Sequence, residues 1–577
     1  MKAFFKYMKP YMFFFILGPL LMLSEVIADV QLPNIVTNMI KYGVATGDKE
    51  YVITSTLKML GIVLFSMAAG VGAAYCAARA SVNFACDLRR DLFKKIQTFS
   101  FKNIDGFSSG SLITRLTNDI TQVQGIINMA MRMMLRSPGM LIGSVIMAYK
   151  IEPEMTKVFL VLIPILVLIV AIIIKIAFPR FEKFQGSIDA LNTSVQEDLT
   201  NVRVIKSLVR EDYEKGNFAK TNENLKNSAM NAMKIVILQM PIMTLVVNFA
   251  TIIILYIAGV GVLNKEMDVA VVSAFITYIT QILMSLMMLT MIFIQMTRAI
   301  ASIKRIKAVF NTDVDIDDDE ASMKEAVVTN GDIEFRNVSF KYYEESQKEV
   351  LDNINLTIKG GETVGIIGST GCGKSTLVQM IPRLYDVMEG EVLVDGINVK
   401  DYKLYNLREG VGMVLQKNVL FSGSIMENLL WGDENATKEE IVKATSSASA
   451  HEFIESFTEG YETDLSQGGV NLSGGQKQRL CIARALLKKP KILILDDSTS
   501  AVDTATEANI REALKNDLQG STKIIIAQRI SSVANADKIV VMNDGCIEMV
   551  GTHEELLANS KTYKEIYDSQ MEGKVGA

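Results

Sequence analysis

A glycine-rich segment, GSTGCGKS at residues 368–375, has the residue types and spacing of a phosphate-binding loop. It matches G-x-x-x-x-G-K-[ST] at every fixed position, a pattern in which backbone N–H groups cradle phosphate oxygens. The Lys374 ammonium can reach the β- and γ-phosphates, and the Ser375 hydroxyl can ligate Mg²⁺. The apolar run 363–367 predicts a buried strand before the loop, and residues 375–384 predict a helix after it. A chance glycine-rich turn is the alternative. Because every fixed position is matched between a predicted strand and a predicted helix, we expect the chain to bind a nucleoside triphosphate.

Further polar side chains stand where other predicted elements begin or end. Asp496 closes the apolar run 491–495, and a carboxylate at the end of a buried strand suits Mg²⁺. Asp497 follows directly. Other polar residues that end or follow strand-like runs, or start helices, are Tyr342, Gln416, Asp503 and Gln528. The segment LSGGQ at 472–476 opens a predicted helix that continues to residue 484.

Composition divides the 577 residues into two unlike halves. Hydrophobic residues make up 49% of the chain, mean hydropathy is +0.25, and the long apolar runs lie in the first half. This length predicts two or more domains, and the second half reads as a globular α/β domain. The net charge of −5 gives no basic signature for nucleic acid. Five scattered cysteines without a C-x-x-C pair predict no disulfide framework, and two histidines argue against a histidine metal site.

Six apolar runs in the first half are long enough to cross a membrane, which takes about 20 residues. They lie at 11–33, 52–76, 129–149, 155–178, 235–263 and 269–294. The basic start of the chain also fits a signal peptide, but the length of the first run and its lack of a cleavage site favour a span. The long connections 77–128 and 179–234 hold the basic clusters, so these loops and both termini are expected in the cytoplasm.

Two carboxylates, Glu25 and Asp29, stand four residues apart on one face of the first span. They are either functional intramembrane charges, or an interfacial Asp29 beside a Glu25 that pairs with a neighbouring helix. The methionine-rich sixth span is either an adaptable binding surface or ordinary packing. The acidic stretch 311–330 predicts a linker between a transmembrane domain, 1–310, and an ATP-binding domain, 331–577.

The chain resembles an ABC exporter half-transporter. The resemblance rests on the apolar first half, the phosphate loop, Gln416, LSGGQ and Asp496. The resemblance implies an all-α membrane domain of six helices fused to an α/β P-loop nucleotide-binding domain, with ATP and Mg²⁺ as cofactors. It implies nucleotide binding by Tyr342 on the adenine, Gly368, Ser369, Thr370, Gly371, Cys372, Gly373, Lys374, Ser375, Thr376, Gln416 and Asp496, with Ser375, Gln416 and Asp496 around the metal. It assigns Leu472, Ser473, Gly474, Gly475 and Gln476 to a signature motif that acts on a partner's ATP, Asp503 to the D-loop, and coupling helices to 103–111 and 209–216.

Two positions depart from the resemblance. The family has a catalytic Glu after the strand-end Asp, where this chain has Asp497, and a switch His where it has Gln528. A carboxylate one methylene shorter can fail to reach the attacking water, and general-base catalysis contributes about 10²–10⁴-fold. Gln528 carries no titratable proton at physiological pH. We therefore expect a degenerate site that binds ATP and hydrolyses it weakly; neutral drift is the alternative.

These features predict one half of a heterodimeric exporter of amphipathic drugs, lipids or peptides in a bacterial cytoplasmic membrane. The expected partners are the lipid bilayer and a second half-transporter with an intact Glu and His, and not nucleic acid. A homodimeric exporter with slow ATPase and a membrane ATP sensor that transports nothing are the alternatives. Because Cys372 lies within the phosphate loop, alkylation of its thiol is expected to block nucleotide binding, and ATP is expected to protect it.

Overall fold

Two compact units make up the chain in the computed structural model, which describes residues 2–264, 267–319, 321–343, 348–498 and 501–575. The first unit contains Met1–Gln97 and Ser109–Thr312. The second contains Thr98–Ser108 and Asp313–Ala577. A short segment from the first half of the sequence therefore folds with the ATP-binding half.

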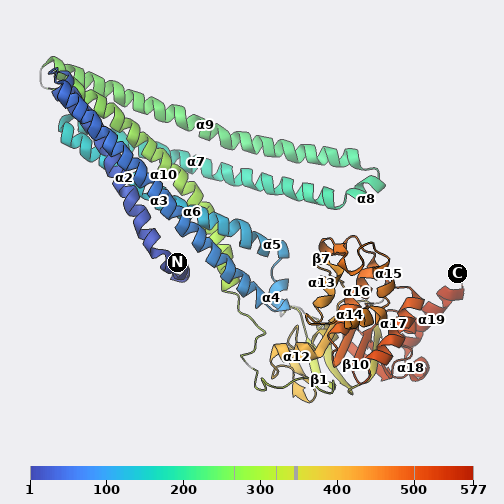
Figure 1. Ribbon diagram of the computed structural model, residues 1–577. Coiled ribbons are helices and arrows are strands. Elements are labelled where there is room, and N and C mark those ends of the chain that lie inside the picture. The colour runs from blue at the N-terminus through green and yellow to red at the C-terminus, as the bar shows by residue number, and fades with distance from the viewer. Residues whose placement is uncertain (1, 265–266, 320, 344–347, 499–500, 576–577) are drawn as a thin grey trace. The chain divides into compact units, whose positions relative to one another are not determined.

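Long helices build the first unit (Figure 1). They are α2 (Met12–Met39), α3 (Lys49–Gln97), α6 (Ile120–Ile151), α7 (Pro153–Thr200), α9 (Glu211–Leu263) and α10 (Val269–Phe310). Short helical segments join them: α1 (Lys2–Met8), η1 (Lys9–Tyr11), η2 (Ile40–Val44), α5 (Ser109–Thr114), η3 (Arg115–Asp119) and α8 (Val202–Ser207). The all-α membrane domain predicted from the apolar runs is thus confirmed.

Five segments in the described residues are long and apolar enough to cross a membrane. They are Phe4–Val44, Lys49–Gln97, Pro153–Thr200, Glu211–Leu263 and Val269–Ile292. The predicted span at 129–149 lies in α6, which does not meet the same requirement because Arg132 and Arg136 lower its hydropathy. This helix instead packs against α2, α3 and α10 inside the bundle. The third predicted span is therefore a helix with two arginines, of which Arg132 is exposed and Arg136 is partly buried.

Small residues let the helices of this bundle approach closely. A Cβ atom added at Gly139 of α6 would lie 3.2 Å from Val26 of α2, and one added at Gly143 would lie 3.1 Å from Val30. Helix pairs in membranes depend on such close packing, because lipid offers no hydrophobic gain on association. The α2–α6 contact is consequently tight at two positions that lie about one helical turn apart.

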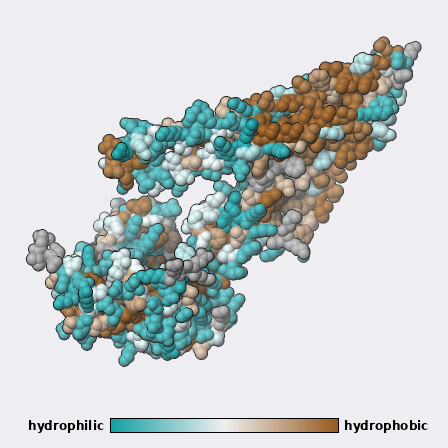
Figure 2. Space-filling model, turned by 180° about the vertical axis from the view of Figure 1, so that it is seen from behind, coloured by the Kyte–Doolittle hydropathy of each residue, from teal (hydrophilic) through white to brown (hydrophobic). Residues whose placement is uncertain are grey.

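The helices α7 and α9 are much longer than a bilayer is thick. At about 1.5 Å per residue, the 48 residues of α7 reach roughly 72 Å, against about 30 Å for a hydrocarbon core. Figure 2 shows hydrophobic side chains gathered over one end of the helical unit, and hydrophilic ones over the half of this pair that leads to α8. Only part of each helix is therefore apolar enough for lipid.

Two sheets form the centre of the second unit. The larger has the order β12-β11-β3-β10-β9-β6, with all neighbours parallel except the β11–β12 pair at one edge. Its strands are β3 (Thr363–Gly368), β6 (Val411–Val414), β9 (Ile492–Asp496), β10 (Thr522–Ile526), β11 (Lys538–Asn543) and β12 (Cys546–Gly551). The smaller antiparallel sheet contains β1 (Ile333–Phe340), β2 (Leu351–Ile358), β4 (Glu389–Val394) and β5 (Ile397–Asn398), and a two-stranded pair joins β7 (Gly423–Ser424) to β8 (Asp464–Leu465). The carboxyl ends of the parallel strands meet at one edge, where open α/β sheets bind ligands.

Helices surround these sheets, and buried hydrophobic clusters form the core between them. The helices are α4 (Phe101–Asp105), α11 (Lys374–Gln379), α12 (Leu404–Gly410), α13 (Ile425–Leu430), α14 (Lys438–Ser447), α15 (His451–Glu455), α16 (Gly474–Leu487), α17 (Thr504–Asp517), α18 (His553–Asn559) and α19 (Lys561–Val575), with short turns η4 (Gly460–Glu462), η5 (Gln467–Gly469) and η6 (Ile530–Ser532). The helix predicted at 375–384 ends at Gln379. Pro382 explains this early end, because it lacks an N–H and disfavours helix in the residue before it. The α/β fold class is confirmed.

Candidate nucleotide-binding site

The phosphate loop leaves β3 at the carboxyl edge of the larger sheet and enters α11. Two of its glycines are required by space and backbone conformation. A Cβ atom at Gly368 would lie 2.1 Å from the Met542 carbonyl oxygen, so no side chain fits there. Gly373 has φ 95° and precedes the first residue of α11, a conformation that glycine adopts without strain. The loop therefore presents backbone at the helix N-terminus, where anions bind.

Lys374 and Ser375 point toward the strand ends from the first turn of α11. The Lys374 ammonium donates to the carbonyl oxygens of Gly368 and Ser369, at 2.9 and 2.8 Å, and so lies over the loop. The Ser375 hydroxyl donates to Asp496 Oδ1 at 2.8 Å. A cation, a hydroxyl and a carboxylate thus meet where the phosphates of a nucleotide would lie.

The Ser375–Asp496 pair fits Mg²⁺ by its chemistry. Both supply oxygen ligands, which this ion prefers, and Mg²⁺ characteristically takes few protein ligands beside phosphate oxygens and water. Asp496 is 2% exposed, and burial, together with the charge of Asp497, raises the pKa of its carboxyl. A cation beside it would relieve that cost. No group of three or more His, Cys, Asp or Glu in the described ranges could hold a metal, so the ion would depend on nucleotide oxygens as well.

Asp497 and Gln528 lie together beside this pair. The Gln528 amide donates to Asp497 Oδ2 at 2.9 Å, and the Gln416 side chain also hydrogen-bonds the same carboxyl. Burial raises the pKa of Asp497, and the two amides partly offset this rise. Asp497 adopts φ 48°, in the left-handed region that Asp tolerates better than most residues, and its N–H donates to the Ile526 carbonyl at 3.0 Å. The two departures predicted from sequence are therefore in direct contact.

Tyr342 lies next to the phosphate loop from the end of β1. Its hydroxyl is 2.9 Å from Thr376 Oγ1, and its ring meets Tyr385 edge-on with centroids 5.2 Å apart. The Tyr385 hydroxyl in turn donates to Asp105 of α4 at 2.7 Å, and its ring packs on Phe101. Sequence reasoning missed Tyr385 and Asp105, because no spacing pattern connects residues 280 positions apart. Only the resemblance, through the coupling helix expected at 103–111, pointed to this segment.

The signature segment caps the long helix α16. Ser473 Oγ accepts from the Gln476 N–H, and Gln476 Oε1 accepts from the Ser473 N–H at 2.9 Å, which forms a capping box. Leu472 is buried in the core, whereas Ser473 and Gly474 are exposed. No hydrogen bond or ion pair between described residues joins this segment to the phosphate loop of the same chain. Within one chain, the described residues of LSGGQ and of the phosphate loop therefore make no direct polar contact.

Asp503 and Cys372 have structural positions that their motifs did not reveal. Asp503 caps α17 by accepting from the Thr506 N–H at 2.9 Å, and this hydrogen bond lowers the pKa of its carboxyl. Cys372 is only 4% exposed and belongs to the hydrophobic core, with its sulfur 3.8 Å from the Lys374 ammonium. Its thiol thus faces inward, so alkylation requires the loop to open.

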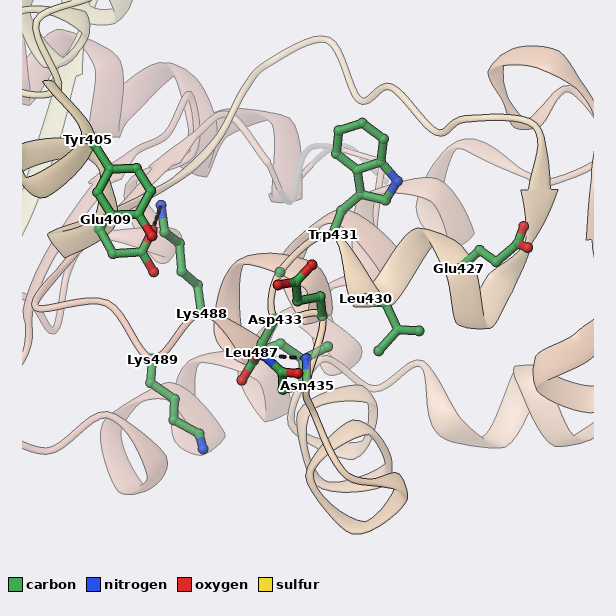
Figure 3. Close-up of a pocket in the computed structure, with 12 residues that line it drawn as sticks. Tyr405, Glu409, Glu427, Leu430, Trp431, Asp433, Asn435, Leu487, Lys488 and Lys489 are labelled. Carbon is green, nitrogen blue, oxygen red and sulfur yellow. Dashed lines mark hydrogen bonds and ion pairs between the residues drawn. The ribbon is translucent and has the colours of Figure 1, made fainter.

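A surface hollow of about 720 Å³ in the same unit contains none of these residues (Figure 3). Its lining includes Tyr405, Trp431 and two lysines. Lys488 donates to the Arg408 carbonyl and lies 3.8 Å from Glu409, and Lys489 pairs with Glu440. Both lysines of the hollow are already paired, so the sheet edge remains the better candidate for a nucleotide site.

Comparisons with known proteins agree with this geometry. Two family models match: the ABC transporter transmembrane region over residues 14–286 and the ABC transporter domain over residues 351–500. The chain is 40% identical over 571 residues to the ABC transporter ATP-binding protein YfiB of Bacillus subtilis, covering 99% of this chain and 98% of that one. It is 36% identical to the putative multidrug export ATP-binding/permease protein YgaD of Bacillus subtilis, covering 84% and 83%.

Two further comparisons concern another relative and a solved structure. The ATP-dependent lipid A-core flippase of Syntrophus aciditrophicus is 33% identical, over 85% of this chain and 81% of that one. The solved structure of a bacterial Atm1-family ABC exporter with ATP bound superposes with a TM-score of 0.80 at 23% identity, covering 98% of both chains. The fold of the whole chain is therefore that of this solved structure.

Proposed function

Since this chain belongs to the ABC transporter family and carries both the transmembrane region and the ATPase domain of that family, we propose that it is one half of a heterodimeric exporter. It is a multi-pass membrane protein with an ABC-type nucleotide-binding domain. Its proposed role is ATP-driven export of amphipathic drugs, lipids or peptides across a bacterial cytoplasmic membrane.

Export of amphiphiles is supported by fold and relatives together. The whole chain has the fold of an exporter, and its relatives include proteins named for multidrug export and for lipid A-core flipping. The positive-inside rule supports a cytoplasmic nucleotide-binding domain, because the long polar connections hold the basic clusters. Both termini then lie in the cytoplasm as well.

Within the proposed site, each side chain has a physical task. Lys374 would hold the β- and γ-phosphates, and Ser375, Asp496 and Gln416 would hold Mg²⁺, which would supply positive charge to the phosphates. Tyr342 supplies an aromatic face for the adenine. Binding thus needs only residues that are present at the carboxyl edge of the sheet.

The hydrogen bond between Gln528 and Asp497 is the observation that carries the degenerate assignment. A base that activates water must reach that water, and here a short carboxylate is held by two neutral amides. The chain's own site is therefore proposed to bind ATP and hydrolyse it weakly. The partner would supply a competent site, completed by the exposed Ser473 and Gly474 of this chain.

ATPase measurements on purified protein test this proposal. The chain alone should hydrolyse ATP far more slowly than the complex with a second half-transporter that has Glu and His at the two positions. A turnover by the single chain equal to that of the complex would favour a homodimeric exporter. Energised vesicles that contain the complex should also accumulate amphiphiles on addition of Mg-ATP, and nucleotide binding without any transport would point to an ATP sensor.

A further inference from the structure

The segment that follows β10 lies at the centre of the nucleotide site. β10 is the strand between β3, which leads into the phosphate loop, and β9, which ends at Asp496. Just past the end of β10, the Ala527 N–H still donates to the Ile366 carbonyl, at 3.3 Å. Residues 528–532, which we call the switch segment, begin directly after this hydrogen bond. Because the segment lies beyond the strand, other contacts must set the path of its backbone.

One side chain of α19 bridges two backbone groups of the switch segment. Gln570 donates through Nε2 to the Gln528 carbonyl oxygen at 2.8 Å, and its Oε1 accepts from the Ile530 N–H at 2.9 Å. These two groups belong to residues two apart, so the amide of Gln570 bonds them as a residue of a parallel strand would. Arg511 of α17 donates to the Ser531 carbonyl. Side chains of two helices thus hold the backbone of the switch segment.

The face of α19 that carries Gln570 is anchored on the larger sheet. Tyr563 is 0% exposed and belongs to a hydrophobic cluster that contains Ala527, and Ile566 and Tyr567 pack against this cluster. These three residues of α19 and Gln570 are spaced three or four positions apart, which places them on one face of the helix. The amide of Gln570 is therefore carried to the switch segment by a helix that is already docked.

We propose that Gln570 is a positioning residue for nucleotide recognition, which holds the Gln528 backbone so that the Gln528 amide faces the γ-phosphate of bound ATP. A side-chain amide has two N–H donors, and Asp497 takes one of them at 2.9 Å. The other can meet a phosphate oxygen at the neighbouring loop. The inference rests on the ATP site proposed above and adds a residue of α19 to it. Because the γ-phosphate distinguishes ATP from ADP, Gln570 should affect this distinction without touching either nucleotide.

Equilibrium binding of two nucleotides tests this role. The full-length chain in lipid nanodiscs is titrated with Mg-ADP and with the magnesium complex of AMP-PNP, an ATP analogue that resists hydrolysis. Gln570→Ala should weaken AMP-PNP binding about three- to tenfold, as expected for the loss of one hydrogen bond, and leave ADP binding within about twofold. Ser569→Ala, at an exposed neighbour on α19, is the matched control and should change neither affinity. Equal losses for the two nucleotides would show a merely structural role and overturn the proposal.

A double-mutant cycle shows whether Gln570 acts through Gln528. Gln528→Ala removes the proposed phosphate contact itself and should weaken AMP-PNP binding relative to ADP binding. In that background, Gln570→Ala should have no further effect, because the side chain that it positions is gone. Additive losses would mean that α19 acts on the nucleotide by another route, and they would contradict the proposal.

A second variant, Gln570→Met, covers the case in which Gln570→Ala does not fold. Methionine fills a similar space but lacks the amide, so the packing of α19 is kept while both hydrogen bonds are lost. This variant should reproduce the selective loss of AMP-PNP affinity, and hydrogen exchange in a peptide that contains Ile530 should become faster. Unaltered affinity and exchange would contradict the proposal.

The binding assay also separates this inference from the proposed function, because it needs neither hydrolysis nor a partner chain. A single chain that hydrolyses ATP as fast as the complex would refute the heterodimer and leave the role of Gln570 standing. A selective effect of Gln528→Ala without any effect of Gln570→Ala would refute the role of Gln570 and leave the ATP site standing.

Discussion

Gln528 donates its side-chain amide to the Asp497 carboxylate at 2.9 Å, which ties the end of β10 to the end of β9. These are the two positions at which the sequence resemblance leads us to expect a Glu and a His, and here the two side chains hydrogen-bond each other. Gln416 contacts the same carboxyl. A catalytic base must be free to take a proton from water, whereas this carboxylate is an acceptor within a neutral network. Asp497 and Gln528, the two residues that differ from the family pattern, therefore form one hydrogen-bonded pair.

Restoring both side chains should therefore restore hydrolysis. The double variant Asp497→Glu with Gln528→His is expected to raise turnover at this chain's own site by about 10²-fold or more. The measurement is steady-state ATPase of the complex whose partner site has been inactivated by Glu→Gln. Adding Lys374→Ala should abolish the gain. No gain in the double variant would mean that the substitutions are not what limits this site.

Two substitutions should separate the roles of the chain's motifs. Asp497→Asn removes a carboxylate already engaged by amides and should change ATPase of the complex little. Gly474→Asp should cost about 10²–10³-fold, because it places charge where the signature motif is proposed to contact a partner's phosphates. Gly474→Ala is the matched control, since among the described residues a Cβ there meets only Ala501 Cβ, at 3.5 Å.

The comparison also tests the heterodimer. A homodimer with two equivalent weak sites would lose activity in Asp497→Asn and in Gly474→Asp alike. Loss in Asp497→Asn with full activity in Gly474→Asp would reverse the roles proposed for the two chains.

Protonation of Asp496 should change the thermal transition temperature of the nucleotide-free protein. Burial raises the pKa of this carboxyl, so the folded state binds its proton more tightly than the unfolded state. Its contribution to stability is then fully present below the ordinary pKa of Asp and is lost as pH rises through the folded pKa. Asp496→Asn should raise the thermal transition at pH 7 without Mg-ATP, and the gain should shrink toward pH 4.

Asp503→Asn provides a control of opposite sign. The hydrogen bond from Thr506 lowers the pKa of Asp503, so its contribution is present above the ordinary pKa and is lost as pH falls through the folded value. This variant should lower the transition at pH 7. Scanning calorimetry from pH 4 to 8 measures both, and shifts of the same sign would contradict the assignment.

Thiol reactivity should follow burial. Cys546 is exposed in the same unit in which Cys372 and Cys481 are buried, so N-ethylmaleimide should modify Cys546 first. Mg-ATP should slow the reaction of Cys372 further and leave Cys546 unaffected. Mass spectrometry of peptides over time gives all three rates in one sample. Equal rates at Cys372 with and without Mg-ATP would remove the thiol from the nucleotide's surroundings.

Sequence patterns predicted what depends on local spacing. The phosphate loop, the strands around it and the helix behind LSGGQ follow from periodicity and turn residues, and β3 and β9 lie where the apolar runs placed them. Contacts between segments that are distant in the sequence could not be predicted from these patterns. Arg136 pairs with Glu25 across 111 residues, and its charge lies in a run that otherwise predicts a lipid-facing span. Burial of the Cys372 thiol also depends on strands that come together only in the fold.

The position of α4 has a consequence for how the protein is made. Asp105 accepts the Tyr385 hydroxyl, and Ser100 and Asn103 hold the chain near Asp315 and Asp313, yet this segment precedes the rest of its unit by more than 200 residues. At about 5–20 residues per second, the ribosome completes the 280 residues between Asp105 and Tyr385 in roughly 14–56 s. During that time α4 lacks the Tyr385 side chain that it contacts in the folded unit. A fragment that begins at Asp313 lacks α4, so its Tyr385 hydroxyl can hydrogen-bond only to water in place of Asp105.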